Sequence, residues 1–210
     1  MNSMPDIEAK NEDRLLVEKF QQGDNSAFDE LVKKYQDKIY GQCYHFTYDA
    51  GDALDLTQDI FIRVFQSLGN FKGQSSFYTW LFRIVHNTCI DYIRHKKAAL
   101  DAENIYSEYV SGKAEQSSPI KLAEAKELED EVSKAMNMLS TREKSAIILR
   151  YYEDLDYKSI SEILGCRIGT VKANISKGMR MLRNIIPSYL TGDSTNFRGG
   201  ELVSYKEGAY

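Results

Sequence analysis

The stretch DYKSISEILGCRIGTVKANISKGMRMLRN, residues 156–184, decides the fold of the C-terminal part of the chain. Its apolar residues recur at intervals of three and four, which indicates amphipathic helices rather than strands. Asp156 can cap a first helix, and Gly165 can end it in the left-handed conformation that glycine adopts at little cost. A second helix opens near Gly169 and Thr170. Two helices joined by a turn of three or four residues form a helix-turn-helix, whose second helix enters the major groove of DNA.

The second helix of this motif has one apolar and one polar face. The apolar face carries Val171, Ile175 and Met179. The opposite face presents short polar and cationic side chains near the helix start, where base edges are reached: Thr170, Lys172, Ala173, Asn174 and Lys177. Two packed helices of an ordinary bundle, with lysines for solubility, would show the same pattern. The residues of this stretch alone leave that interpretation open.

The chain is acidic as a whole, whereas two of its segments are basic. Its 210 residues carry a formal net charge of -4, which taken alone argues against a nucleic-acid partner. Residues 157–184, however, carry six Lys and Arg side chains against one acid, and residues 72–97 carry five against one. Because each basic segment overlaps a predicted amphipathic helix, the charge distribution favours nucleic-acid binding over a merely solvated surface.

Helical periodicity also organises the rest of the chain. The composition, 42% hydrophobic and 28% charged with 3 Pro, excludes collagen-like, disordered and disulfide-scaffold classes. The periodicity dissolves between Ala98 and Pro119, in an acid-rich segment typical of a linker. We therefore predict an all-α fold of two small helical domains joined by a flexible acidic linker, the second containing the helix-turn-helix. The predicted parts are a first domain at 1–97, a linker at 98–121, a second domain at 122–187 and a mobile tail at 188–210.

Short local signals mark helix ends in both domains. Gly23-Asp24-Asn25 predicts a break between two helices, with Asn25 or Ser26 as the N-cap of the second. Ser140, followed three residues later by Glu143, predicts a capping box at the start of a helix.

The stretch FKGQSSFYTWLFRIVHN, residues 71–87, interleaves aromatic and cationic residues. Unpaired bases are bound by this combination, because every base offers a face for stacking and every nucleotide a phosphate. Phe77 and Trp80 also have the spacing of core residues in a helix, which is the simpler interpretation for Trp80 alone. The loop that begins with Phe71-Lys72-Gly73 favours single-strand binding.

Two separate blocks of the sequence resemble extracytoplasmic-function sigma factors, which belong to the sigma-70 family of RNA polymerase subunits. The first block is similar to the family's second domain and contains DLTQDIFIRVF at 55–65, FKG at 71–73 and DYIR at 91–94. The second is similar to its fourth domain and contains LSTRE at 139–143, ISEILG at 160–165 and GTVK at 169–172. The motifs occur in the family's order, and the resemblance covers roughly residues 15–186.

The resemblance implies three sets of functional residues. Residues on the helix at 55–68 would dock on core RNA polymerase: Asp55, Gln58, Asp59 and Arg63. Without the family, a solvated helix face would be the preferred interpretation of that set. A loop and the helix after it would capture the melted strand of the minus-ten element, including a flipped base: Phe71, Lys72, Gly73, Ser76, Arg83 and Asn87. The recognition helix and the residue before it would read the duplex minus-35 element: Arg167, Thr170, Lys172, Ala173, Asn174 and Lys177.

Some of these residues depart from the common family pattern. Lys72-Gly73-Gln74 stands where many members have Arg-Gly-Asp, and Asn174 stands where arginine is commoner. Asparagine pairs bidentately with adenine, whereas arginine favours guanine, so we expect a different base preference there.

The main alternative is a helix-turn-helix transcription regulator that binds duplex DNA and never contacts polymerase. Such a regulator needs neither an aromatic, basic strand-binding loop nor the polar face at 55–63. An enzyme is not expected, because His45, His86 and His95 lack the spacing of metal ligands and no phosphate-binding Gly-rich loop or GxSxG turn occurs. We expect no catalytic residues, no metal, no cofactor and no small-molecule substrate.

Localisation and partners follow from the same observations. No apolar run approaches the roughly 20 residues of a membrane span, and the first ten residues carry acids instead of a signal, so a cytoplasmic protein is expected. The three cysteines are too far apart for a CxxC pair and are expected to be reduced and buried. The resemblance implies core RNA polymerase, promoter DNA and an anti-sigma protein as partners, and a membrane-anchored anti-sigma protein could hold the chain at the inner membrane.

Overall fold

The computed structural model describes residues 4–107 and 123–185, and within these ranges the ordered elements are helices. This confirms the all-α fold class. The first domain is built from four helices: α1 (Met4–Gln21), α2 (Ser26–Thr47), α3 (Ala50–Leu68) and α4 (Phe77–Ser107). The second contains five elements, of which one is a short π-helix: α5 (Ala123–Asn137), α6 (Thr141–Ile147), η1 (Ile148–Tyr152), α7 (Tyr157–Leu164) and α8 (Ile168–Ile185).

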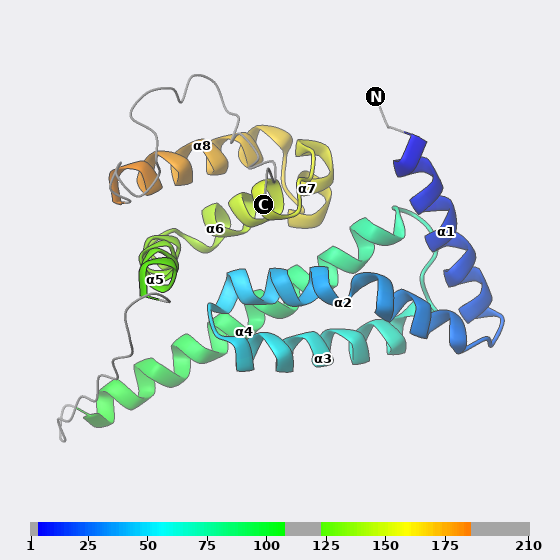
Figure 1. The fold of residues 1–210 in the computed structure, drawn as a ribbon, viewed down its shortest axis with the longest axis horizontal. Helices are drawn as coiled ribbons and strands as arrows, with labels where there is room; N and C mark the ends of the chain where they lie inside the picture. The colour runs from blue at the N-terminus through cyan, green and yellow to red at the C-terminus, as the bar shows by residue number, and fades with distance from the viewer. Residues whose placement is uncertain (1–3, 108–122, 186–210) are drawn as a thin grey trace.

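The core of the first domain lies between α2, α3 and α4, with α1 packed across one end (Figure 1). Helix α2 is continuous because apolar side chains follow one another at intervals of three and four along its buried face: Leu31, Tyr35, Ile39, Cys43 and Phe46. The break before α2 lies at Gly23, whose φ of 102° is favourable for glycine. Asn25, one of the two predicted candidates, is the N-cap residue of α2, but its side chain makes no capping hydrogen bond. Asp24 Oδ1 instead accepts a hydrogen bond from the Ser26 backbone N–H at 3.0 Å.

The second domain follows its predicted helix ends closely. Ser140 and Glu143 form the capping box of α6, and Asp156 caps α7 by accepting a hydrogen bond from the Ser159 backbone N–H at 2.7 Å. Gly165 ends α7 with a φ of 60°. Helix α8 packs on α6 at Gly178, where an added Cβ would lie 2.6 Å from the Ile147 side chain. The absence of a side chain at this position permits the close approach of the two helices.

Two features of the helices differ from the sequence expectations. Helix α4 continues to Ser107, so it extends into the segment where a linker at 98–121 was expected. Residues 148–152 form a π-helix that no sequence pattern indicated. The central part of the expected linker and the C-terminal tail at 188–210 lie outside the described residues. In the described ranges, no helix combines the length and apolar character needed to cross a membrane.

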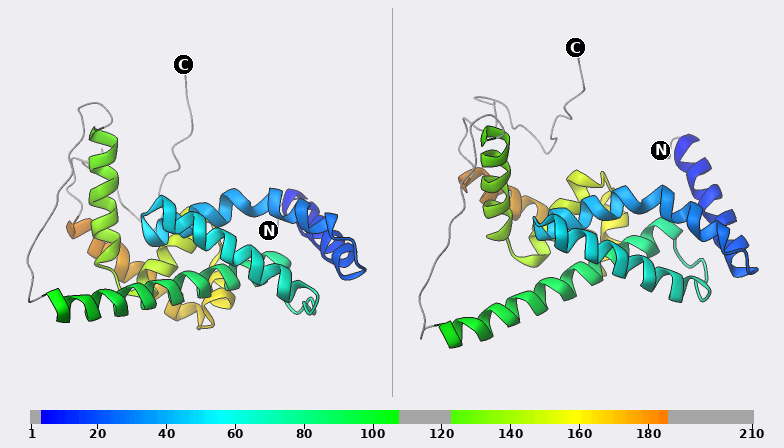
Figure 2. Two further views of the ribbon diagram at one scale, coloured as in Figure 1. Left: turned by 90° about the horizontal axis from the view of Figure 1, so that it is seen from below. Right: turned by 60° about the horizontal axis from the view of Figure 1, so that its bottom comes forward.

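The two domains pack against each other along α4. Helix α7 lies beside α4, and the π-helix η1 contacts α2 (Figure 2). This arrangement brings the start of the helix-turn-helix next to the helix that carries the predicted strand-binding residues Arg83 and Asn87.

Candidate polymerase and nucleic-acid interfaces

The solvent-facing side of α3 carries the predicted polymerase-docking residues. Its opposite side is buried in the first domain, so this helix has one free face. That face exposes all four predicted residues: Asp55, Gln58, Asp59 and Arg63. It also exposes three large apolar side chains that sequence analysis did not select: Leu54, Ile62 and Phe65, with 52%, 55% and 45% of their surface accessible. Charged residues beside exposed apolar ones are typical of a protein-binding surface, and the helical period of the sequence could have shown this mixture.

The predicted strand-binding loop lines a surface cavity of about 640 Å³. Phe71, Lys72, Gly73 and Ser76 lie on one side of it, and residues of α1 line the other side. The Phe71 ring is anchored on Trp80, with 5.0 Å between ring centroids, while Lys72 and Gly73 are exposed. Gly73 has a φ of 66°, so the turn at this position favours glycine. The loop thus joins an anchored aromatic residue to an exposed cation.

Ser76 has a structural contact that the sequence analysis did not anticipate. Its Oγ accepts a hydrogen bond from the Thr79 backbone N–H at 3.1 Å and lies 2.8 Å from Thr79 Oγ1. This is the geometry of a residue that caps the start of a helix, here α4. Ser76 therefore fixes the end of the loop as well as lining the cavity.

Arg83 and Asn87 lie apart from that loop, on the side of α4 that faces the second domain. The Arg83 guanidinium donates to the backbone carbonyl of Glu162 in α7 at 2.9 Å. Asn87 lines an interdomain cavity of about 690 Å³, which is also lined by Thr170 and Asn174 of the recognition helix. Residues predicted to read two different promoter elements thus share one cleft.

The residues predicted for minus-35 readout have different surroundings. Asn174 is half-buried, and the other five are exposed: Arg167, Thr170, Lys172, Ala173 and Lys177. The Lys172 ammonium lies 5.3 Å from the Tyr157 ring centroid. Lys177 is paired with the buried carboxylate of Glu143 at 2.9 Å, and this contact, with the capping hydrogen bonds, lowers the Glu143 pKa. Lys177 therefore ties α8 to α6, a role that its spacing did not reveal.

Lys144 connects the second domain to the end of α2. Its ammonium donates to the Phe46 carbonyl at 2.9 Å and to Asn137 Oδ1 at 2.8 Å, and it lies 5.1 Å from the Tyr48 ring centroid. Burial lowers the pKa of this side chain to about 8. The carbonyls at a helix C-terminus attract cations, so the contact is electrostatically favourable.

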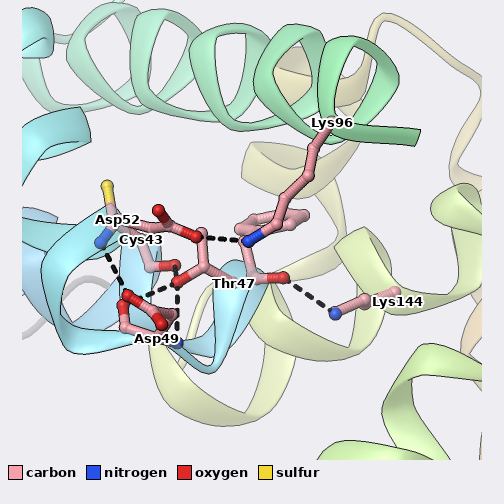
Figure 3. A network of polar contacts seen from close by, with 7 residues as sticks. Cys43, Thr47, Asp49, Asp52, Lys96 and Lys144 are labelled. Carbon is pink, nitrogen blue, oxygen red and sulfur yellow. Dashed lines mark hydrogen bonds and ion pairs between the residues drawn. The ribbon is translucent and has the colours of Figure 1, made fainter. Parts of the chain in front are cut away.

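The connection between α2 and α3, which Lys144 contacts at Phe46, is also held by Lys96 of α4 (Figure 3). Lys96 of α4 pairs with Asp52 at 2.5 Å, and Asp49 caps α3 by accepting from the Asp52 backbone N–H at 2.8 Å. Figure 3 shows Lys96 and Lys144 approaching the connection between α2 and α3 from different elements. The cationic contact from the second domain is thus made to a rigid part of the first.

Two further contacts join the domains. The Tyr78 hydroxyl lies 3.3 Å from Glu153 Oε2, and burial raises the Glu153 pKa to about 7, although the charge of Lys38 and the Tyr78 hydrogen bond lower it in part. The His45 ring lies against Tyr152, with 3.5 Å between ring centroids. His86, in the wall of the cleft, has a pKa lowered by burial to about 4. The interface therefore contains two groups whose pKa values are shifted toward neutral pH, Glu153 and Lys144.

The described residues contain no group of three or more His, Cys, Asp or Glu placed to hold a metal ion. Cys43 and Cys89 are buried, with their sulfur atoms 3.8 Å apart, whereas Cys166 is half-exposed in the turn of the helix-turn-helix. The expectation of buried thiols thus holds for two of the three. The contact between Cys43 and Cys89 could not be read from their separation in the sequence.

Comparison with known families identifies both domains. The Sigma-70 region 2 family matches residues 31–99, and the Sigma-70, region 4 family matches residues 129–182. The RNA polymerase sigma-H factor of Pseudomonas aeruginosa is 37% identical over 174 residues, which cover 79% of this chain and 89% of that protein. The ECF RNA polymerase sigma-E factor of Escherichia coli K12 is 35% identical over 178 residues, which cover 82% of this chain and 93% of that protein.

Solved structures with a similar fold include two complexes. CnrH in complex with the cytosolic domain of CnrY has a TM-score of 0.64 at 21% identity, and the match covers 87% of this chain and 99% of that one. The sigma factor RpoE in complex with the anti-sigma factor NepR, from Bartonella quintana, has a TM-score of 0.58 at 24% identity, and the match covers 75% of this chain and 95% of that one. These likenesses establish that the arrangement of helices is shared.

Proposed function

The chain belongs to the sigma-70 family, as an RNA polymerase sigma factor of the extracytoplasmic-function type, and we propose that its two domains divide promoter recognition between them. It directs core polymerase to specific promoters and initiates transcription. The first domain docks on polymerase through the free face of α3 and captures the melted minus-ten strand through the loop at 71–76. The second places α8 in the major groove of the minus-35 element.

The single observation that carries this division is the cavity beside the loop at 71–76. Its wall combines an aromatic ring, an exposed lysine and an exposed glycine, and its volume of about 640 Å³ is large enough for a nucleotide-sized ligand. Flipping a base costs a few kcal/mol of unstacking, which stacking and charge at the site must offset. A regulator that binds duplex DNA alone has no need for such a cavity.

The packing of the two domains supports the proposal that the free chain has a different domain arrangement from the promoter-bound chain. Minus-ten and minus-35 elements lie about 25 base pairs apart, which is about 85 Å along B-form DNA. Asn87 and Asn174 line one cleft, so the two domains cannot contact both elements in this arrangement. Polymerase binding would separate the domains, and the free chain would bind promoter DNA weakly until then.

The partners of this function are core polymerase, promoter DNA and an anti-sigma protein. The two similar solved structures are complexes with CnrY and with the anti-sigma factor NepR, which supports a protein inhibitor for this chain as well. The function places the chain in the cytoplasm, and a membrane-anchored inhibitor would hold it at the inner membrane. As an initiation factor it carries no catalytic step of its own.

Transcription by core polymerase tests the docking face of α3. The double variant Gln58→Ala, Asp59→Ala should lose promoter-specific transcripts from a genomic fragment library, because it removes polar contacts from the exposed face. The matched control is Gln36→Ala, Asp37→Ala, which removes the same residue types from the exposed surface of α2.

The control variant should transcribe like the natural chain. If the natural chain neither stimulates transcription nor co-migrates with core polymerase, and instead binds duplex DNA tightly, a helix-turn-helix regulator becomes the correct assignment.

A further inference from the structure

Helix α1 ends against the beginning of the strand-binding loop, although the two are far apart in the sequence. The side-chain amide of Gln21 donates to the carbonyl of Leu68 at 3.1 Å and to the carbonyl of Phe71 at 2.9 Å. A glutamine amide has two N–H groups, so both are used here. The two acceptors lie on either side of the point where α3 ends and the loop begins.

These hydrogen bonds determine where the loop begins in space. The Leu68 carbonyl, one of the last of α3, accepts from the Phe71 backbone N–H at 3.1 Å as well as from Gln21. Through the Phe71 carbonyl, Gln21 also holds the next segment of chain. Phe71 is further fixed by its contact with Trp80, and Ser76 fixes the other end of the loop through Thr79. Between these anchored ends, Lys72 and Gly73 are exposed at the cavity.

Helix α1 also forms the second wall of the same cavity. Five of its residues line the space opposite the loop: Asn11, Arg14, Val17, Glu18 and Gln21. Arg14 is paired with Glu18 at 2.8 Å in this wall, and Val17 is buried. A ligand held by the loop would therefore lie between helix α1 and a loop that is anchored at both ends.

We infer that Gln21 is a positioning residue for minus-ten recognition, which holds the loop at 71–76 at a fixed distance from α1 so that one unpaired base fits between them. The inference rests on the proposed function of that loop. Gln21 acts through the loop and sets which base is accepted, because a cavity of fixed width discriminates between purine and pyrimidine bases better than a mobile one.

The test is a selection with core polymerase and the full chain on a premelted promoter library, with both the unpaired minus-ten strand and the duplex minus-35 element randomised. Gln21→Met keeps the length of the side chain but donates no hydrogen bond. Gln22→Met is the matched control, because Gln22 is the next residue and its side chain is exposed. Thermal melting of each variant reports whether the fold is retained.

Gln21→Met should lower the preference at one minus-ten position by about fivefold to tenfold, because two hydrogen bonds are lost, and should leave the minus-35 preferences unchanged. Gln22→Met should keep the natural preferences throughout. Natural preferences at every position in Gln21→Met, or equal losses in both elements, would overturn the positioning role. If the natural chain itself selects no sequence with polymerase, the proposed function fails, and the inference fails with it.

Discussion

The two places where this chain is proposed to meet the melted strand differ in what covers them. The loop at 71–76 borders a surface cavity, and its cation Lys72 is exposed. Arg83 is bonded to the backbone of α7, and Asn87 lines the cleft between the domains. One half of the proposed minus-ten surface is thus exposed in the isolated chain, whereas the other half faces the second domain.

Under the proposed function, domain packing controls the use of a DNA-binding surface without any change in the surface itself. The loop is organised within its own domain, by Gln21, Trp80 and Thr79. The cleft depends on contacts between domains, chiefly those of Lys144 and Arg83. Variants that act on one of these sets should leave the other unaffected.

Breaking the Lys144 contact should have the largest effect. In Lys144→Glu a carboxylate would replace the ammonium at the Phe46 carbonyl, so the packed arrangement should be lost. Hydrogen bonds from charged groups contribute about 1.5–3 kcal/mol. Because packing places Thr170 and Asn174 of α8 in the cleft, its loss should raise the affinity of the free chain for duplex minus-35 DNA about tenfold or more. Fluorescence anisotropy with a labelled duplex measures this change.

The control for that variant is Lys33→Glu, which makes the same change of charge on the exposed surface of α2. It should bind duplex DNA no more tightly than the natural chain. Equal affinities for the two variants would show that Lys144 does not restrain the second domain.

Comparison of Lys72→Ala with Arg83→Ala sharpens the contrast between the two places. In the free chain, Lys72→Ala should weaken binding to a single-stranded minus-ten oligonucleotide about fivefold, because an exposed phosphate contact is lost. Arg83→Ala should change it by less than about twofold, since the guanidinium is already engaged by the Glu162 carbonyl.

With core polymerase bound, both substitutions should weaken strand binding, because separation of the domains frees Arg83. If Arg83→Ala weakens strand binding by the free chain as much as Lys72→Ala does, then Arg83 is as accessible to the strand as Lys72, and the contrast between them is wrong.

A pH dependence of domain packing is the smallest expected effect. The Glu153 pKa is raised to about 7 in the packed arrangement, so the protonated form is favoured there. The resulting stabilisation of packing is complete below the ordinary pKa of 4.5 and is lost as pH rises through about 7. Relative to a variant that does not titrate at this position, lowering the pH from 8 to 6.5 should therefore favour packing about fourfold.

Small-angle scattering across this pH range measures the packed fraction. In Glu153→Gln the amide does not titrate, so lowering the pH from 8 to 6.5 should favour packing about fourfold less than it does in the natural chain. Acidification across this range also opposes packing through Lys144 and His86, because burial lowers their pKa values to about 8 and about 4. Both chains share these two groups, so the difference between the chains reports the effect of Glu153. The same pH response in both chains would exclude Glu153 as its source.

Local signals in the sequence were sufficient for most helix ends and for the free face of α3. The capping box of Ser140 and Glu143 and the cap at Asp156 need only neighbouring residues, so spacing predicts them. Asn25 is the N-cap residue of α2 as predicted, but the side chain that accepts a hydrogen bond there is that of Asp24, one residue earlier, which bonds the Ser26 backbone N–H. A shift of one residue is typical where several capping residues are adjacent.

Contacts between distant segments were beyond the reach of sequence patterns. Gln21 lies 50 residues from Phe71, and Lys144 lies 98 residues from Phe46, so no periodicity relates them. Lys177 was assigned to DNA on its position alone, whereas the fold also pairs it with Glu143. A polar residue at the end of a helix can form hydrogen bonds with any segment that the tertiary fold brings near. A single sequence does not show which segments those are.

The most direct test of the account is the distance between the domains, measured by pulsed electron paramagnetic resonance. Spin labels at Lys97→Cys and Arg180→Cys, both exposed positions, would be placed in a chain with Cys166→Ser, since Cys43 and Cys89 are buried. The account predicts one narrow, short distribution for the free chain. On core polymerase with promoter DNA the mean should lengthen by about 20 Å or more, because the two elements are far apart on the duplex. The same distribution in both states would contradict it.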